Sequence, residues 1–483
     1  MTIKDLSPAI VWNYFYEICQ IPHPSKKEEK IIDYLINFAK SHNLDVKKDH
    51  VGNVLITKPA TKEGLANVVL QSHIDMVCEK NRDTVHDFDK DPIDTYIDGD
   101  WVKARGTTLG ADNGIGVAAE LALLASTDVE HGKLECLFTV DEETGLTGAF
   151  ALERDFFTGK YLINLDTEEE GEFYIGCAGG KGTTATFTYK KENVPSNYFW
   201  FKVQVTGLNG GHSGSEIHKG LGNANKILDR YLWTLSGKYD LILSEIDGGN
   251  LHNAIAREAY AIAGVPYSDK EFVAVELNNF IPLIEDELKV VDPNVKMSID
   301  STDIPQFIID KKTTANLLNA IYACPHGVLN MSHDIPDLVE TSTNLASVKM
   351  KENNTIVIGT SQRSSSESLK NDAANMVNAV FTLAGAKVVH GEGYPGWKPN
   401  PKSEILVIAR DCYQKLYNKT PEIKAIHAGL ECGLFLEKYP YLDMISCGPT
   451  IREAHSPAEK VNIPSVGLWW DLLLEMLKSI PAK

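Results

Sequence analysis

The stretch 67-NVVLQSHIDMV-77 begins as a buried β-strand and ends in polar side chains. Its run of apolar, mostly β-branched residues at 68–70 is typical of a strand in the interior of a sheet. His73 and Asp75 follow directly. A histidine near a strand end is more often a structural residue than a metal ligand, so this stretch alone leaves both interpretations open. The decision depends on whether other strands end in the same way.

The segments around this strand alternate between helical and strand patterns. Residues 26–42 are amphipathic with a helical period, and residues 114–126 form an apolar helical segment. Residues 133–140 and 160–165 have the composition of buried strands. This alternation predicts a mostly parallel sheet with helices on its faces.

The alternation of helices and buried strands stops near residue 183 and resumes near residue 395. Between these points, partly exposed strands surround a long helical segment at 220–235, which indicates an α+β domain. The Pro/Gly-rich stretch 393-GYPGWKPNPKSE-404 marks its end. We therefore expect an α/β fold: a discontinuous αβα domain with a mostly parallel sheet at 1–182 and 395–483, and an inserted α+β domain at 183–394.

Composition excludes several classes of partner. The chain has 483 residues with 47 Lys and Arg against 66 Asp and Glu, a net charge of −19. This balance argues against nucleic acid or an anionic membrane as the partner. We find neither a signal-peptide pattern nor a long apolar run, and the eight cysteines form no CxxC pair. These features predict a cytoplasmic protein with reduced thiols and no membrane span.

Potential metal ligands follow each of the predicted core strands. In open α/β sheets, ligands bind beyond the carboxyl ends of the strands. The residues at these positions are Glu142 and Glu143 after 133–140, Asp166 after 160–165, and His455 after the strand at 441–447, with Asp112 directly before the apolar helix.

Each of these residues also has an ordinary structural interpretation. Asp112 could cap the helix, and Glu142 with Glu143 could form a solvated turn. Asp166 begins an acidic run typical of an exposed surface, and His455 could be an ordinary loop histidine. Several strands of one sheet ending in His, Asp and Glu nevertheless favour a metal site over independent structural uses.

The residue types indicate which metal such a site would bind. Two imidazoles and three carboxylates without thiolates suit a pair of Zn²⁺ ions or related divalent ions such as Co²⁺ or Mn²⁺. Asp112, held at a helix start, suits a bridging position. Since Glu142 and Glu143 are adjacent, one can bind metal while the other accepts a proton from water. Asp75 can hydrogen-bond to the imidazole of His73.

The same residues form a set of motifs that resembles the M20 family of co-catalytic metallopeptidases. The matching segments are HID (73–75), GADNG (110–114), DEETG (141–145), NLD (164–166), the late His455, and GGHSG (210–214), which is similar to the lid motif of that family. Within the family, the segments LQSHIDMVCEK, TVDEETGLTGA and HAGLECGLF are most similar to those of the aminoacyl-histidine dipeptidases. This resemblance covers nearly the full length of the chain.

The resemblance implies a role for each matching residue. Metal ligands would be His73 and Asp166 on one ion, Glu143 and His455 on the other, and Asp112 as the bridge. Attack on the peptide carbonyl would come from a metal-bridged hydroxide, with Glu142 as general base and Asp75 orienting His73. His212, in a lid domain at 183–394, would stabilise the oxyanion.

Asn253 and Arg363 match positions that bind the C-terminal side of the substrate. A guanidinium suits a free carboxylate, although Arg363 could also be a surface residue and 209–214 a simple hairpin turn.

The resemblance further implies a dipeptidase acting on unblocked dipeptides, notably Xaa-His, with carnosine as a candidate substrate, and a homodimer formed through the lid domain. Two alternatives stay open. One is another M20-type hydrolase: a tripeptidase, a carboxypeptidase or an N-deacylase. The other is a non-catalytic metal-binding protein.

Overall fold

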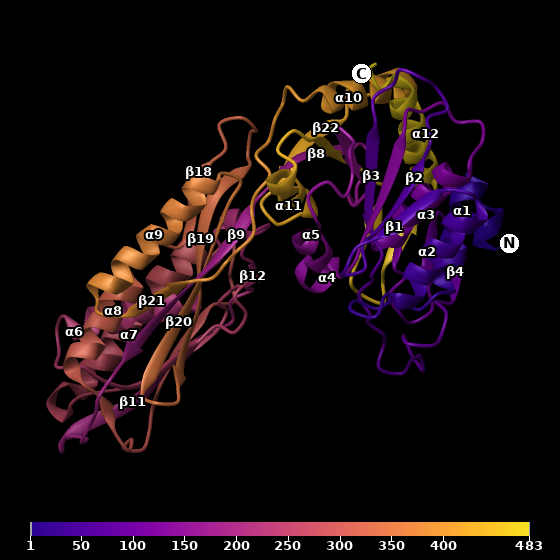
Figure 1. The fold of residues 1–483 in the computed structure, drawn as a ribbon. Helices are drawn as coiled ribbons and strands as arrows, with labels where there is room; N and C mark the ends of the chain where they lie inside the picture. The colour runs from indigo at the N-terminus through magenta and orange to yellow at the C-terminus, as the bar shows by residue number, and fades with distance from the viewer. Residues whose placement is uncertain (1, 483) are drawn as a thin grey trace. The chain divides into compact units, whose positions relative to one another are not determined.

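The computed structural model describes residues 2–482 and divides into two compact units (Figure 1). The first unit contains the residues up to Gly176, Pro399–Ala425 and the residues from Leu430 onward, and the second contains Cys177–Lys398 and Ile426–Gly429. The first junction therefore follows residue 176 instead of 182, and the second follows residue 398 instead of 394. The return of residues 426–429 to the second unit has no signal in the sequence.

An eight-stranded sheet forms the centre of the first unit, in the order β1-β2-β6-β3-β7-β23-β8-β22. Its strands are β1 (Asp45–Lys48), β2 (Val54–Lys58), β3 (Val68–His73), β6 (Leu134–Thr139), β7 (Tyr161–Asn164), β8 (Glu172–Cys177), β22 (Glu422–Ile426) and β23 (Asp443–Ser446). Parallel pairing joins β6, β3, β7 and β23, whereas β1, β2 and β8 pair antiparallel with their neighbours. The predicted α/β class is confirmed, with parallel pairing at the centre of the sheet.

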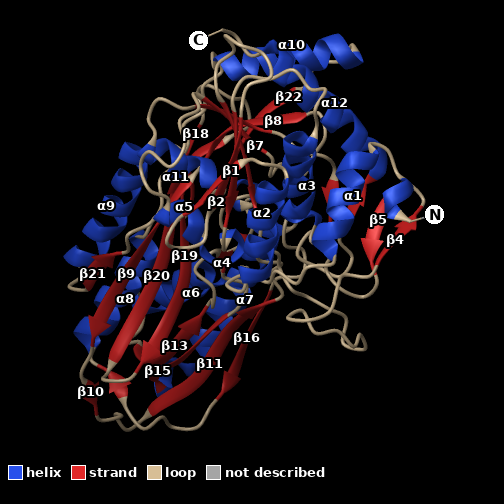
Figure 2. Cartoon of the chain, turned by 45° about the vertical axis from the view of Figure 1, so that its right-hand side comes forward, coloured by secondary structure: helices blue, strands red, loops and turns tan. Residues whose placement is uncertain are grey.

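Helices pack against this sheet (Figure 2). They are α1 (Ala9–Cys19), α2 (Glu29–Ser41), α3 (Ala111–Ala125), α10 (Glu404–Tyr417), α11 (Glu431–Lys438) and α12 (Ile463–Ser479), with the short α4 (Glu142–Gly145) and α5 (Thr147–Ala151) after β6. Helix α3 is buried along nearly its whole length and contacts β3, while α2 contacts β1 and β2. Because β3 lies at the centre of the sheet, all six of its residues are buried, as expected for a covered parallel strand. A small four-stranded sheet contains β4 (Thr95–Asp98), β5 (Trp101–Ala104), β24 (Ile451–Arg452) and β25 (Lys460–Asn462).

The second unit is an antiparallel sheet with four helices packed on it. The sheet contains β9 (Gly179–Thr188), β11 (Tyr198–Thr206), β13 (Ile242–Gly248), β15 (Ala259–Pro266), β16 (Lys296–Ser301), β18 (Gly327–Met331), β19 (Val339–Lys351), β20 (Thr355–Ser364) and β21 (Lys387–His390). The helices are α6 (Ala224–Ser236), α7 (Lys270–Leu288), α8 (Lys311–Ala323) and α9 (Glu367–Leu383), which contact one another as well as the strands. A separate pair joins β12 (Gly211–His212) to β14 (Ala254–Ile255). This arrangement is α+β, as the sequence pattern predicts.

Helix α6 begins at Ala224 and not at residue 220, because Asn223 caps it. The Asn223 side chain accepts hydrogen bonds from the backbone N–H groups of Asn225 and Lys226. Of the helices within residues 2–482, none combines the length and apolar character needed to cross a membrane.

Candidate metal centre and active site

The parallel strands deliver four of the predicted side chains to one edge of the sheet. His73 is the last residue of β3, Glu142 and Glu143 open α4 just after β6, and Asp166 lies two residues after β7. Since β3 pairs in parallel with both β6 and β7, the carboxyl ends of these strands meet. The topology thus brings together residues that are far apart in the sequence.

Asp112 lies in the first turn of α3, but it does not cap the helix. Gly110 occupies the cap position, and Asp112 has a non-helical backbone conformation with φ −84° and ψ 105°. Its Oδ1 atom lies 3.1 Å from Nε2 of His73, and its Oδ2 atom lies 3.1 Å from Nε2 of His455. The capping interpretation therefore fails, and this carboxylate lies between two imidazoles, as a bridging ligand would.

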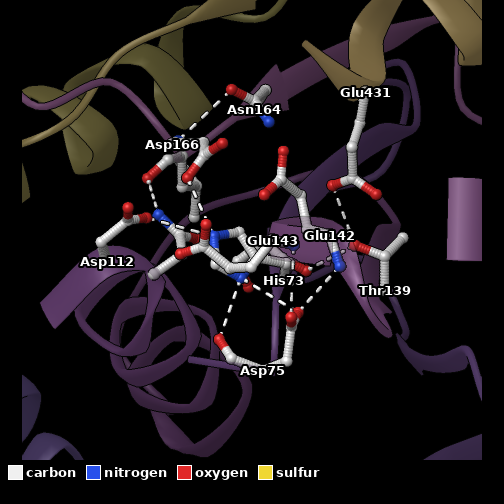
Figure 3. A network of polar contacts seen from close by, with 12 residues as sticks. His73, Asp75, Asp112, Thr139, Glu142, Glu143, Asn164, Asp166 and Glu431 are labelled. Carbon is white, nitrogen blue, oxygen red and sulfur yellow. Dashed lines mark hydrogen bonds and ion pairs between the residues drawn. The ribbon is translucent and has the colours of Figure 1, made fainter. Parts of the chain in front are cut away.

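Two groups of potential ligands share Asp112 (Figure 3). His73, Asp112 and Asp166 form one group, and Asp112, Glu143 and His455 form the other; within each group the donor atoms lie within 4.8 Å of one another. The buried Oε1 atom of Glu143 has no hydrogen-bond partner among residues 2–482, so an acceptor is left without a donor. The imidazole nitrogens and carboxylate oxygens of the two groups therefore fit two divalent cations such as zinc.

The electrostatics of these residues also favour cations. Burial raises the pKa of Asp166 to about 6 and that of Glu168 to about 8. The hydrogen bond to Asp112 is the main cause that raises the pKa of His455 to about 11. At His73, burial opposes the charged form, but the neighbouring Asp166 and Asp112 still raise the pKa well above its ordinary value. Excess negative charge in a buried centre would be balanced by bound divalent cations.

Asp75 connects the imidazole of His73 to the start of α4. Its Oδ1 atom lies 3.3 Å from Nδ1 of His73 and accepts the N–H of Glu142 at 3.0 Å. Its Oδ2 atom accepts the N–H of Glu143 at 3.3 Å and the hydroxyl of Ser25 at 2.7 Å. Burial raises the pKa of Glu142 well above its ordinary value. Asp75 therefore orients both an imidazole and the segment that carries the expected base.

In the second unit, His212 is held by its own loop. The N–H of Ser213 donates to the backbone oxygen of Asn253 at 2.8 Å, which ties the two predicted positions together. Nδ1 of His212 accepts the N–H groups of Gly214 at 3.3 Å and Ser215 at 3.1 Å. Because Nδ1 is the acceptor, the proton of the neutral ring is on Nε2. His212 can therefore act as a hydrogen-bond donor.

Arg363, on β20, is not a surface residue, because it is only 8% exposed. Its Nη1 atom donates to the hydroxyl of Tyr394 at 2.8 Å, and its Nη2 atom lies 3.4 Å from Nε2 of His212. Since Nε2 carries a proton, this second contact joins two donors and leaves both available to an anion. Nε of Arg363 also lacks a partner within the described part of the chain. Burial, together with this guanidinium, lowers the pKa of His212 and keeps its ring neutral.

Comparison with known proteins assigns the chain to a family. The model of peptidase family M20/M25/M40 matches residues 69–479. The chain belongs to this family. A relative from Escherichia coli (strain K12), named cytosol non-specific dipeptidase, is 47% identical over 100% of this chain and 99% of its own length. The resemblance predicted from the motifs is confirmed.

Solved structures agree with this classification. The aminoacylhistidine dipeptidase from Vibrio alginolyticus superimposes with a TM-score of 0.94 at 45% identity, covering 100% of this chain and 99% of that one. A tripeptidase from Staphylococcus aureus reaches a TM-score of 0.57 at 16% identity over 98% and 99% of the two chains. The second similarity shows a shared fold only.

This M20 chain contains a supporting residue that the sequence analysis missed. Glu459 is 2% exposed and accepts four successive backbone N–H groups, those of residues 109–112. Its Oε2 atom accepts the N–H groups of Leu109 and Gly110 at 2.7 and 3.0 Å, and its Oε1 atom accepts those of Ala111 and Asp112 at 2.8 and 3.3 Å. Glu459 therefore fixes the turn that presents Asp112. Its position four residues after His455 is the one available hint, and it is too weak to identify this contact.

Two residues of the segment 427-HAGLECG-433, His427 and Glu431, have buried polar contacts. Nε2 of His427 lies 2.7 Å from the hydroxyl of Ser342, and burial lowers the pKa of His427 to about 3. The ring is therefore neutral and held within the second unit. Glu431 belongs instead to the first unit, where it contacts the central sheet (Figure 3).

Proposed function

We propose that this chain is a dinuclear zinc dipeptidase that hydrolyses unblocked dipeptides, including Xaa-His and carnosine. The observation that carries the proposal is the pair of ligand groups sharing Asp112, with the carboxyl of Glu142 beside them. The full-length similarity to two proteins named as dipeptidases supports the choice of substrate class. Cobalt or manganese would be expected to substitute for zinc.

His73 and Asp166 would hold one cation, Glu143 and His455 the other, and Asp112 both. Bound there, the cations would polarise the peptide carbonyl and lower the pKa of water. Glu142 accepts the proton of the attacking water and delivers it to the leaving amine as the C–N bond breaks. Asp75 keeps Nε2 of His73 directed at the ligand group by contacting Nδ1 of the same ring.

The second unit is proposed to be the lid that binds substrate. His212 would donate its Nε2 proton to the oxyanion as it develops. Arg363, with donors unused within residues 2–482, would bind the C-terminal carboxylate, together with Asn253. We also propose that the first unit is the catalytic domain, that the chain forms a homodimer through the lid, and that the protein is cytoplasmic.

The first test is hydrolysis of a panel of small substrates by the zinc-loaded protein, with and without a chelator. The panel contains Ala-His, β-Ala-His, Ala-Ala, Ala-Ala-Ala and N-acetyl-Ala. We expect release of free amino acids from the dipeptides alone, and loss of that release when the metal is removed. The acetylated substrate is the matched control, because it has a scissile amide but no free amino group.

Cleavage of the tripeptide or of N-acetyl-Ala in preference to the dipeptides would contradict the proposal and favour another M20-type hydrolase. Cleavage of no substrate by protein that binds two zinc ions would favour the non-catalytic alternative. The oligomeric state is measured separately by sedimentation, where a monomer would contradict the homodimer.

Replacing Tyr394 with Phe should weaken substrate binding more than turnover. The hydroxyl of Tyr394 accepts a hydrogen bond from Nη1 of Arg363 and holds the guanidinium plane. Loss of one such bond corresponds to a KM for Ala-His raised by roughly 3- to 10-fold, with kcat little changed. Tyr198→Phe is the control, because its hydroxyl contacts Asp240 at the surface of the same unit. A KM unchanged in Tyr394→Phe would show that Arg363 needs no such support.

A further inference from the structure

A row of buried polar side chains crosses the central strands of the first unit. Two of its members, Thr139 and Asn164, are shown beside the ligand groups in Figure 3. Gln71 on β3, Thr139 on β6, Asn164 on β7 and Ser446 on β23 are all 0% exposed. Parallel strands covered on both faces are normally apolar at such positions. Burying four polar side chains in one row is costly unless each is hydrogen-bonded, so their presence needs an explanation.

The hydrogen bonds of this row all run in one direction. The hydroxyl of Ser446 donates to Oδ1 of Asn164, and Nδ2 of Asn164 donates to Oε1 of Gln71 at 2.6 Å. Nε2 of Gln71 then donates to Oε2 of Glu431 at 2.6 Å and to the hydroxyl of Thr139 at 3.1 Å. Thr139 also donates to Oε2 of Glu431, at 2.9 Å. The chain of donors therefore ends on one carboxyl oxygen.

Glu431 is the member that sets this direction. An amide side chain can be turned over to exchange its oxygen and nitrogen, so Gln71 and Asn164 have no fixed orientation of their own. An acceptor at Glu431 requires the nitrogen of Gln71 to face it, and the oxygen of Gln71 then requires the nitrogen of Asn164. Glu431 is 1% exposed and enters from α11, outside the sheet.

The orientation of Asn164 reaches the proposed metal ligands directly. With its nitrogen facing Gln71, its Oδ1 atom accepts the backbone N–H of Asp166 at 3.3 Å. A reversed amide would place an NH₂ group against that N–H and lose the contact. Gln71 lies two residues before His73 on the same strand, and Thr139 stands opposite His73 in the register. The row therefore joins the three strand ends that carry His73, Asp166 and the Glu142–Glu143 pair.

We propose that Glu431 is a positioning residue for the metal centre: as the terminal acceptor of this row, it orients Gln71 and Asn164 and thereby the strand ends that present His73 and Asp166. The proposal rests on the metal site of the proposed function, but not on the substrate. Its requirement is a hydrogen-bond acceptor at residue 431, not a negative charge.

The test compares Glu431→Gln with Glu431→Met in the full-length protein. Gln keeps a side-chain oxygen that can accept from Gln71 and Thr139, whereas Met fills the space with a thioether that is only a weak acceptor. Glu135→Met is the matched control, because Glu135 is a buried carboxylate near the opposite end of β6 that accepts from Thr158. The measurement is the Kd for Zn²⁺ by competition with a chromophoric chelator, without substrate.

We expect Glu431→Met to raise the Kd for Zn²⁺ by roughly 10- to 100-fold, the effect typical of groups that orient metal ligands. Glu431→Gln should bind Zn²⁺ like the unmodified chain, and so should Glu135→Met even where its melting temperature falls. Unchanged Zn²⁺ binding in Glu431→Met would overturn the proposal, and equal weakening in Glu431→Gln would show that charge matters instead.

If Glu431→Met does not fold, Gln71→Met breaks the same row from the other side. The same weakening is expected there, and ordinary Zn²⁺ binding would overturn the proposal. Because Zn²⁺ binding is read without catalysis, a failure to hydrolyse dipeptides leaves this test valid.

Discussion

Replacing Glu142 with Gln should lower kcat for dipeptide hydrolysis by roughly 10²- to 10⁴-fold, the usual contribution of a general base. The amide keeps the shape of the side chain but cannot accept the proton of the attacking water. Glu142 is not a member of the two ligand groups that share Asp112, so the two proposed Zn²⁺ ions should still bind. Steady-state kinetics on Ala-His, with zinc content measured on the same sample, checks both expectations.

Glu143→Gln is the informative control, because Glu142 and Glu143 are neighbours at the start of α4. The Gln substitution at 143 should reduce the zinc content and the activity together, whereas the one at 142 should reduce the activity alone. Glu142 also lies within 4.8 Å of His73 and Glu143, so a third ligand group is possible on distance alone. Loss of zinc in Glu142→Gln would make Glu142 a ligand and would require another base.

The location of the site follows from simple topology. Carboxyl ends of adjacent parallel strands must meet, so polar residues after 68–70, 133–140 and 160–165 could be grouped without knowing any distance. The same reasoning could not decide whether Asp112 is a metal ligand, because an Asp directly before a helix is equally well explained as a helix cap. The structure decides it through the non-helical backbone of Asp112 and its contacts to both imidazoles.

The supporting residues could not be predicted, because their partners are too distant in the sequence. Glu431 meets Gln71 across 360 positions, and Glu459 meets Leu109 across 350. A lone glutamate in a helix or loop has no periodicity that distinguishes it from a solvated one. Gln71 directly follows the apolar run at 68–70, and its polar side chain gives no sign that it lies fully buried within the strand.

Replacing Glu459 with Ala should have the largest effect on stability among the changes considered. Four backbone N–H groups, those of residues 109–112, lose their acceptor in a buried turn. An unsatisfied buried donor costs about 1–3 kcal/mol, and water entering the vacated space would offset part of the sum. We therefore expect the free energy of unfolding to fall by about 3 kcal/mol or more. Urea unfolding of the metal-free protein measures this change without the contribution of bound zinc.

The same variant should lose zinc as well as stability, because the turn held by Glu459 presents Asp112 to both ligand groups. Glu459→Gln keeps one acceptor oxygen for the four donors and should fall between Ala and the unmodified chain in both measurements. Glu453→Ala is the matched control, since Glu453 is an exposed residue of the same loop. An Ala variant that loses stability but still binds two zinc ions with ordinary affinity would mean that Asp112 keeps its position without this carboxylate. In that case the contacts of Asp112 with the imidazoles of His73 and His455 would have to be sufficient to hold it in place.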